Sequence, residues 1–546
     1  MHHALTHLAE EHVCAASVDS FVNSEPKQYR DAIRSQEAEE WKKSMKEEMD
    51  SMERLGVWKI VPSPKGVTTL KGRWVYKNKL GDNNQLIRRK ARFVAKGFQQ
   101  VYGRDFFETH SPVAKMKSIK LILSLVAQLD LELYQIDFDT AFLNANVEED
   151  IYMEQPEGFH KGSADMVCKL VKSIYGLKQA SRNWNLEIDS FMKSIGYTPL
   201  ISDSCVYIKR TQSDRFVLLS LYVDDTIVAC DKKDISVWES DKKAIASQYA
   251  IKDLGECEWI LNMKVTRDRS NRTMTLSQEA YIERIIREFN MENMKPASTP
   301  APVSDLFLPV DSTDPQLLDK KQTVQYQSMV GALLYAANIT RIDIAFIVGQ
   351  LCRYTSKPCV HHIQAATHVF RYLKRTTAVC LIFGLQSFDP KFIDVTAYSD
   401  ANWGSDLETG KSNSGGLVRF NGDIISWHSK RQKSVAQSSA ESEYMALAET
   451  VKEVLWYRSW VYEIFGHYIR CTIRCDNTAA IQLSQNDSIH NRSKHINIRY
   501  HLVRDTVKKG RIDITWVGTR EQQADILTKA LGPSLFTEQC DHLLLF

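Results

Sequence analysis

The stretch that decides the fold reads Phe216-Val-Leu-Leu-Ser-Leu-Tyr-Val-Asp-Asp-Thr-Ile-Val-Ala-Cys230. Two apolar runs flank the adjacent residues Asp224 and Asp225, a pattern that predicts two buried strands joined by a hairpin. The turn lacks the glycine or asparagine that a two-residue hairpin turn usually contains. Two like charges between apolar strands are costly unless a cation lies against them, and Mg²⁺ prefers carboxylate oxygens. Asp224 and Asp225 are therefore candidate metal ligands, with ordinary polar turn chemistry as the alternative.

The composition is that of a globular protein with several domains. The chain has 546 residues, of which 43% are hydrophobic and 25% charged, and its net charge is only +3. Its eleven cysteines are an odd number, which favours reduced thiols over a disulfide framework. The apolar run near residues 121–127 is too short to span a bilayer, and residues 1–24 show no signal peptide. We therefore expect a soluble intracellular protein without a membrane partner.

Charge is strongly segregated along the chain. Residues 71–97 contain nine Lys or Arg and one acid, on alternating segments around a predicted turn at residues 81–84. Such a hairpin is either a solvated surface or a phosphate-binding element, for which Lys90, Arg92 and Lys96 are the candidates. Residues 121–160 contain nine acids and no Lys or Arg. Within them, residues 131–137 alternate like a strand that ends on Asp137, a candidate third metal ligand.

The order of these motifs resembles the copia-type reverse transcriptases of LTR retrotransposons. The resemblance rests on Trp41–Val61, Lys90–Phe98, Tyr134–Asn144, Glu148–Phe159, Lys172–Trp184 and Tyr222–Asp225. It implies a right-hand polymerase with fingers, palm and thumb, in which Asp137, Asp224 and Asp225 are the catalytic carboxylates and hold Mg²⁺, or Mn²⁺ in its place. It also implies nucleotide contacts by Phe142, beneath the incoming sugar, and by Gln179.

Three residues depart from the pattern of the family: Ala145 and Asn262 replace usual glycines, and Ser181 replaces a usual proline. None of the departures removes a carboxylate. Asn262 lies in a segment that resembles the primer-holding loop, so it bears on how a primer is positioned.

The segments after the predicted hairpin read as helices separated by a linker. Ser277 and the spacing of Ile282, Ile285, Ile286 and Phe289 predict an amphipathic helix suited to a thumb. Residues 295–325 contain five prolines and read as a linker. Residues 331–376 read as helical and resemble the connecting region of the same family.

A second group of acids follows in the C-terminal part of the chain. The order is a strand at 392–400, a hairpin around Asn421-Gly422, a helix at 438–466, a strand at 469–475 and a further helical segment. This order resembles the ribonuclease H fused to copia-type reverse transcriptases, a mixed α/β domain. The resemblance implies that its catalytic metal ligands are Asp400, Glu443, Asp476 and Asp525. Glu441 is a rival for Glu443, and residues 430–433 and 492–511 are basic candidates for phosphate contact.

Together these patterns predict an α+β multidomain protein. The expected ranges are a leader (1–24), a reverse transcriptase (25–300), a linker and helical connection (301–390), a ribonuclease H-like domain (391–532) and a tail (533–546). The resemblance implies an RNA-directed DNA polymerase with a tethered ribonuclease H that uses two-metal phosphoryl transfer. Its expected partners are an RNA template, a DNA primer, deoxynucleoside triphosphates, RNA–DNA hybrid and other parts of a Pol polyprotein. Its expected location is the cytoplasm, within virus-like particles.

Two alternatives compete with this interpretation. A catalytically inactive or host-adopted remnant would only bind nucleic acid, and the loss of a carboxylate would favour it; all seven are present. A nuclease without polymerase activity is opposed by the complete finger and palm motifs.

Overall fold

The computed structural model describes residues 25–80, 86–211, 215–301, 317–386, 388–389, 392–485 and 497–543. The predicted leader and the predicted turn at 81–84 lie outside these ranges. The described chain forms two compact units that alternate along the sequence. The first unit contains residues 25–115 and 133–256, and the second contains 116–132 and 257–543. These units do not coincide with the ranges expected from sequence, which remain predictions about where each activity resides.

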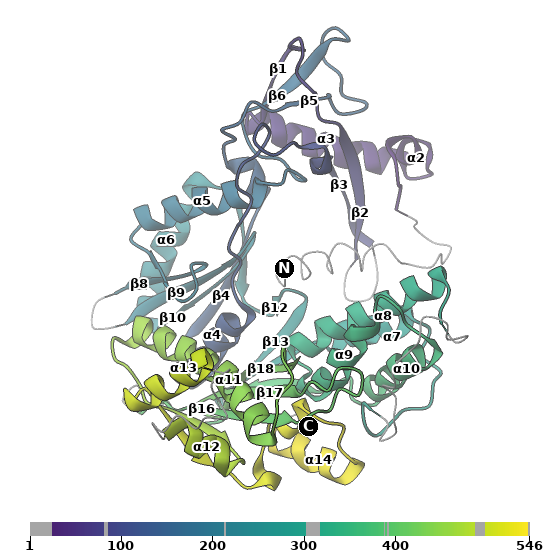
Figure 1. Ribbon diagram of the computed structural model, residues 1–546. Coiled ribbons are helices and arrows are strands. Elements are labelled where there is room, and N and C mark those ends of the chain that lie inside the picture. The colour runs from purple at the N-terminus through teal and green to yellow at the C-terminus, as the bar shows by residue number, and fades with distance from the viewer. Residues whose placement is uncertain are drawn as a thin grey trace. The chain divides into compact units, whose positions relative to one another are not determined.

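The first unit contains three sheets, which are visible as separate groups of arrows in Figure 1. Their strand orders are β1-β6-β5, β2-β3 and β11-β4-β10-β9-β8-β7. The strands are β1 (Trp58–Pro62), β2 (Gly72–Leu80), β3 (Leu86–Ala95), β4 (Glu132–Phe138), β5 (Tyr152–Met153), β6 (Met166–Leu170), β7 (Thr198–Pro199), β8 (Val206–Arg210), β9 (Phe216–Tyr222), β10 (Asp225–Cys230) and β11 (Ile251–Glu256). The predicted hairpin at 216–230 is β9–β10, and both of its strands are internal to the six-stranded sheet.

Helices of the first unit cover these sheets through apolar faces. They are α2 (Tyr29–Arg34), α3 (Ala38–Arg54), α5 (Ala180–Ser194) and α6 (Ile235–Gln248), with 3₁₀ turns η1 (Gly97–Gln99), η2 (Ala141–Asn144) and η4 (Lys232–Asp234). The apolar stripe predicted near residues 38–56 is the buried face of α3, where Trp41 packs edge-on against Tyr76 of β2. Trp184 of α5 and Trp238 of α6 share one core with residues of β4, β9 and β10.

The second unit begins with an apolar helix, a four-stranded sheet and a set of helices. These elements are α4 (Met116–Leu129), β12 (Trp259–Ile260), β13 (Met263–Asp268), β14 (Thr273–Ser277), α7 (Glu279–Glu288), α8 (Lys320–Ile339), η5 (Ile342–Ile344), α9 (Ala345–Leu351), η6 (Cys352–Tyr354), α10 (Val360–Arg375) and β15 (Cys380–Phe383). Strands β12, β13, β14 and β15 pair in that order. α7 is the predicted amphipathic helix, and the Ser277 hydroxyl accepts a hydrogen bond from the Glu279 N–H at its start.

A five-stranded mixed sheet forms the C-terminal part of the second unit. Its elements are β16 (Val395–Asn402), β17 (Asn413–Phe420), β18 (Asp423–Arg431), α11 (Ser439–Phe465), β19 (Cys471–Cys475), α12 (Thr478–Gln485), α13 (Asn497–Lys508), β20 (Ile512–Trp516), η8 (Thr519–Glu521), η9 (Asp525–Leu527) and α14 (Pro533–His542). The strand order is β18-β17-β16-β19-β20, in which β16 pairs parallel with β19 and antiparallel with β17. The predicted order of strand, hairpin, helix, strand and helix is confirmed.

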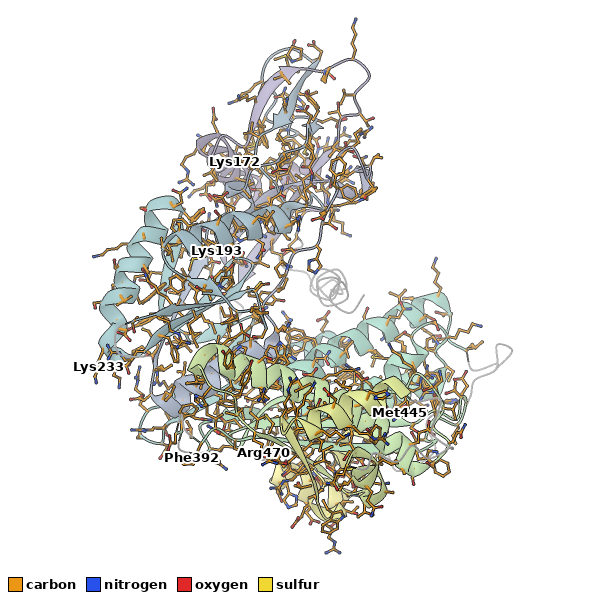
Figure 2. All side chains as sticks on the ribbon, turned by 60° about the vertical axis from the view of Figure 1, so that its left-hand side comes forward. Lys172, Lys193, Lys233, Phe392, Met445 and Arg470 are labelled. Atoms are coloured by element: carbon orange, nitrogen blue, oxygen red, sulfur yellow. The ribbon has the colours of Figure 1, made fainter. Side chains whose placement is uncertain are left out.

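The ends of α11 follow from local chemistry. Ser438 accepts a hydrogen bond from the Glu441 N–H at the helix start, and Gly466 ends the helix with φ of +77°. Asn421 and Gly422, with φ of +44° and +84°, form the predicted tight turn between β17 and β18. One face of α11 is buried along its length, and it includes Met445, which is 4% exposed and labelled in Figure 2.

Two sequence expectations need correction. The predicted linker at 295–325 is too long at its C-terminal end, because Asp319 caps α8 and helix begins at Lys320. The segment 533–543 of the predicted tail is the helix α14, whose Gln539 and Cys540 are fully buried. No helix among the described residues is long and apolar enough to cross a membrane.

Candidate active sites

The aspartate pair lies on a strained turn between two buried strands. Tyr222 pairs with Asp225, so Val223 and Asp224 alone form the turn. Val223 has φ of +60°, a left-handed conformation that a β-branched residue adopts at a cost of about 1–3 kcal/mol. The lack of glycine and asparagine in the turn was an indication of this backbone strain in the sequence. The backbone N–H of Phe138 donates to the Asp224 carbonyl at 3.0 Å, which fixes β4 beside the turn.

The six-stranded sheet brings Asp137, near the end of β4, to the same end of the sheet as Asp224 and Asp225. Burial, with the charges of Asp224 and Asp139, raises the pKa of Asp137, whereas Lys252 opposes this shift. Lys252 is the register partner of Asp137 on β11, and its ammonium lies 3.5 Å from the Asp137 carboxylate and also pairs with Asp139. Lys252 was not expected from sequence, because only strand pairing brings it to a residue more than 100 positions earlier.

Asp225 is held differently from its neighbour. The amide of Gln135 donates to the Asp225 carboxylate at 2.7 Å. Among the described residues, the three polymerase-type carboxylates do not form a group whose ligand atoms all lie within 4.8 Å of one another. Asp137, Asp224 and Asp225 all offer carboxylate oxygens to a hard divalent cation, which would relieve the repulsion that Asp224 exerts on the Asp137 carboxylate.

A chain of side chains connects two of the predicted nucleotide-binding residues. The guanidinium of Arg92, on β3, lies 4.5 Å from the centroid of the Tyr175 ring, and Tyr175 contacts Phe142 edge-on at 5.3 Å. Phe142 is half-buried on η2 and packs against two cores of the first unit, one containing Trp41 and Tyr76 and the other containing Trp184 and Trp238. Tyr175 was not predicted from the sequence as a site residue, although it lies within the Lys172–Trp184 motif.

Lys90 neighbours Arg92 on the predicted phosphate-binding hairpin. Burial, followed by the charge of Arg92, lowers the pKa of Lys90, while Glu48 opposes this shift. Glu48 is 6% exposed and one of its oxygens has no hydrogen-bond partner among the described residues. Because the positive charges of Lys90 and Arg92 lie close together, binding of an anion would be favourable here. Phosphate contact therefore stays the prediction for this hairpin.

Lys96 and Gln179 have different surroundings. Lys96 lies at the end of the hairpin, where its backbone N–H donates to the Lys71 carbonyl. Gln179 is 1% exposed, and its amide accepts from Gln100 and donates to the Asp105 carbonyl and to Glu149. The Gln179 amide nitrogen donates to two protein acceptors and its oxygen accepts one protein hydrogen bond, so the geometry supports a role in fixing the loops. Its contact with a nucleotide stays a prediction.

Asn262, which replaces a glycine usual in the family, lies in another tight turn. Ile260 pairs with Met263, so Leu261 and Asn262 form the turn between β12 and β13, with φ of +49° and +62°. Asparagine tolerates this conformation better than most residues with a side chain. The backbone shape that a glycine would allow is therefore retained at the predicted primer-holding loop.

The second set of carboxylates comes together at one end of the five-stranded sheet. Asp400 lies on β16, Glu443 on α11, Asp476 directly after β19, and Asp525 at the start of η9. Parallel pairing of β16 with β19 brings Asp400 and Asp476 to neighbouring strand ends. All four acids interact electrostatically with at least one other member of the set.

Glu443 is the most perturbed of the four. It is 6% exposed, and burial, followed by the charges of Asp400 and Asp476, raises its pKa to about 10. One of its carboxylate oxygens is buried without a hydrogen-bond partner among the described residues. Ligand atoms of Glu443, Cys475 and Asp476 lie within 4.8 Å of one another. A buried acidic cluster with an unpaired oxygen fits a divalent cation, which would remove the repulsion that raises this pKa.

Several polar neighbours of this cluster were not found from sequence. The Thr528 hydroxyl donates to Asp400, Thr519 donates to Asp476 at 3.2 Å, and the Lys529 ammonium lies 2.9 Å from Asp525. Burial and the Asp400 charge raise the pKa of Asp525 to about 7 despite Lys529. Thr528 and Lys529 lie three and four residues after Asp525 in the motif Asp525-Ile-Leu-Thr-Lys529. This short spacing could have identified them as neighbours of the acidic cluster.

The geometry favours Glu443 over its rival Glu441. The Glu441 carboxylate accepts a hydrogen bond from the Gln437 N–H at 2.9 Å, and its own N–H donates to the Ser438 hydroxyl. Both bonds engage Glu441 in the first turn of α11, where its carboxylate accepts from the residue that precedes the N-cap Ser438. Glu441 therefore starts the helix, and Glu443, about half a turn later, faces the other acids.

The basic segments predicted near this cluster are only partly described. Residues 486–496, including Arg492 and Lys494, lie outside the described ranges, as does the Arg499 side chain. Arg504 on α13 donates to the Leu483 carbonyl at 2.9 Å. Phosphate contact by the residues of 430–433 and 492–511 stays a prediction.

Comparison with known proteins identifies the family. Residues 55–303 match the sequence profile of the family described as reverse transcriptase (RNA-dependent DNA polymerase). The chain is 44% identical over 95% of its length to the retrovirus-related Pol polyprotein from transposon TNT 1-94 of Nicotiana tabacum, covering 39% of that protein. It is 34% identical over 58% of its length to a transposon Ty5-1 protein of Saccharomyces cerevisiae, all of which it covers. The chain belongs to the copia-type retrotransposon Pol family.

This copia-type chain spans about two fifths or less of the length of the first Pol polyproteins it matches. One of them is the Pol polyprotein from transposon RE1 of Arabidopsis thaliana, to which the chain is 34% identical over 95% of its own length and 34% of the relative. Among solved structures, the N-terminal ribonuclease H domain of a Mycobacterium tuberculosis protein matches 25% of this chain and 95% of its own, with 14% identity and a TM-score of 0.19. Reverse transcriptase and ribonuclease H families generally use divalent metals.

Proposed function

We propose that this chain is an RNA-directed DNA polymerase with a tethered ribonuclease H, and that both activities depend on Mg²⁺, with Mn²⁺ as a substitute. The observation that carries the proposal is the presence of two separate carboxylate groups, one in each compact unit, each at strand ends of a sheet. Such clusters are the protein's contribution to phosphoryl transfer by metal ions.

In the polymerase site, Asp137, Asp224 and Asp225 would hold the metal, and the hydrogen bond from Gln135 would orient the Asp225 carboxylate. Metal bound there would activate the primer 3′-hydroxyl and stabilise the pyrophosphate leaving group. Lys252 limits the repulsion between the carboxylates of Asp137 and Asp139 before a substrate enters. Lys90 and Arg92 would bind the triphosphate of the incoming deoxynucleotide.

Phe142 would select the sugar in this site. A DNA polymerase must reject ribonucleotides, which differ from its substrate by one 2′-hydroxyl. Attraction cannot do this, because the correct substrate lacks the group, so rejection requires a steric clash. The edge-on contact with Tyr175 and the packing against two cores hold the Phe142 ring in one orientation, as a clash requires.

In the ribonuclease site, Asp400, Glu443, Asp476 and Asp525 would hold the metal that activates water against an RNA phosphodiester. Thr528 and Thr519 orient two of these carboxylates by hydrogen bonds, and Lys529 balances the charge on Asp525. An RNA–DNA hybrid would be distinguished by its shape and 2′-hydroxyls. We also propose that the chain acts in the cytoplasm, inside virus-like particles, beside other parts of a Pol polyprotein.

The test is a pair of assays on the full chain. Primer extension on an RNA template and cleavage of the RNA strand of a hybrid are measured with Mg²⁺, with Mn²⁺ and with EDTA. The proposal expects both activities with either metal and neither in EDTA. Binding of primer–template without extension or cleavage, in every metal condition, would instead favour a remnant that only binds nucleic acid.

A further inference from the structure

The aspartate turn of the polymerase unit adopts a conformation that its own sequence disfavours. Val223 is β-branched, yet it has φ of +60°, where glycine or asparagine is usual. A turn of this kind persists only where its surroundings hold it. Its surroundings therefore matter for the position of the next residue, Asp224.

One side chain is placed to hold this turn. The indole N–H of Trp184, on α5, donates to the Val223 carbonyl at 2.7 Å. Trp184 is 1% exposed and Val223 is half-buried, so the bond is partly buried and the indole N–H has little access to water if its partner is lost. The next carbonyl, that of Asp224, accepts from the Phe138 backbone N–H at 3.0 Å. Both carbonyls of the turn are thus held, one by a side chain and one by the neighbouring strand.

The position of the indole is itself fixed by aromatic packing. Its ring meets Phe138 edge-on at 5.3 Å and Tyr249 edge-on at 5.5 Å between centroids. Phe138 directly follows Asp137 on β4. The same indole therefore contacts the strand that carries Asp137 and holds the turn that carries Asp224.

We propose that Trp184 is a positioning residue for DNA synthesis: its N–H holds the left-handed turn at Val223 and so keeps Asp224 beside Asp137. The inference rests on the proposed polymerase activity. It assigns a role to the indole nitrogen alone, as distinct from the ring, whose contribution to the core any large apolar residue shares.

The chain offers a matched control for this distinction. Trp238, on α6, is fully buried in the same core, and its indole N–H has no hydrogen-bond partner among the described residues. Trp184→Phe and Trp238→Phe remove the same atoms from the same core, but only the first removes a hydrogen bond to the turn. Incorporation of benzothienylalanine at position 184, which replaces the N–H by sulfur, is a second variant that keeps the size of the bicyclic ring.

The experiment measures primer extension by the full chain on an RNA template with Mg²⁺. For each variant it records kcat, the KM for deoxynucleotide, the Kd for primer–template, thermal stability and hybrid-RNA cleavage. Trp184→Phe and the sulfur analogue should lower kcat roughly tenfold, the scale of one intramolecular hydrogen bond. KM, Kd and hybrid cleavage should stay within about twofold of the unsubstituted chain, as should kcat, KM, Kd and hybrid cleavage of Trp238→Phe. Both tryptophan-to-phenylalanine variants should lose thermal stability, because each leaves a cavity in the same core.

Three outcomes would overturn the inference. One is an unchanged kcat in the sulfur analogue. Another is an equal loss of kcat in Trp238→Phe. The third is a fall in kcat accompanied by a proportional rise in KM and Kd, which would indicate a loosened core. Absence of extension by the unsubstituted chain would refute the proposed polymerase and this inference with it, whereas normal extension combined with any of the three outcomes refutes the inference alone.

Discussion

Replacing Glu443 with glutamine should stabilise the metal-free chain and abolish hybrid-RNA cleavage. The Glu443 carboxyl is 6% exposed, and burial with the charges of Asp400 and Asp476 raises its pKa to about 10. Without metal, folding at neutral pH therefore requires this group to take up a proton. Neutral pH lies about 2.5 pH units above the ordinary pKa of 4.5, and at 1.36 kcal/mol per unit the uptake costs at most about 3 kcal/mol. Glutamine carries no such cost.

The sign of the pH dependence follows from the same comparison. Because the folded pKa of Glu443 is above the unfolded value, the folded state holds the extra proton, and this group favours folding most below about pH 4.5. Its contribution is lost progressively as the pH rises toward 10. The unfolding free energy of Glu443→Gln should therefore exceed that of the unsubstituted chain by a margin that grows with pH across this window.

The assay is urea or thermal unfolding in EDTA at several pH values, repeated with Mg²⁺. Mg²⁺ should stabilise the unsubstituted chain, since a ligand that binds only the folded state adds stability, and should stabilise Glu443→Gln less. Glu441→Gln is the control, because its carboxylate accepts the Gln437 N–H at the start of α11. It should lose about 1 kcal/mol of stability and keep cleavage. A Glu443→Gln chain that is no more stable than the original in EDTA at any pH would refute the reasoning from burial and like charge.

Three further predictions concern other sites. Asp224→Asn should abolish DNA synthesis and leave hybrid-RNA cleavage intact, since the two carboxylate groups belong to different compact units; unimpaired primer extension would contradict the assignment of the β9–β10 turn. Phe142→Val should raise the ratio of ribonucleotide to deoxynucleotide kcat/KM, whereas an unchanged ratio in a folded variant would remove Phe142 from the site. His362, fully buried and stacked on Tyr354 at 4.0 Å, has its pKa lowered to about 4 by burial. Stability should therefore fall as the pH drops from about 6.5 toward 4, and an equally steep fall in His362→Phe would exclude this histidine as a cause.

The sequence predicted elements well where local chemistry defines them. The aspartate hairpin is confirmed because its two apolar runs are long enough for buried strands on either side of a turn. The bounds of α11 follow from Ser438 and Gly466, whose capping roles depend only on neighbouring residues. The tight turn at Asn421-Gly422 follows from the preference of these residues for positive φ.

Contacts between distant strands and helices could not be predicted in the same way. Lys252 reaches Asp137 only because β11 pairs with β4, and Trp184 reaches Val223 only because α5 packs on the sheet. The three protein partners of Gln179 (Gln100, Asp105 and Glu149) likewise come from other parts of the chain, and its nucleotide contact, implied by the family motif, stays a prediction. Partner identity in each case depends on tertiary packing, which a single sequence does not encode locally.

The placement of α4 has a consequence for the order in which the chain can fold during its synthesis. Residues 118–128 of this helix are all buried, and its polar side chains Ser124 and Gln128 both donate to Asp423. Asp423 is synthesised 299 residues after Ser124, which at ribosomal rates of about 5–20 residues per second corresponds to roughly 15–60 s. Throughout that interval an apolar helix lacks the partner that satisfies its polar groups. Nascent chains that end before β18 should therefore be the ones that chaperones hold and that aggregate most readily.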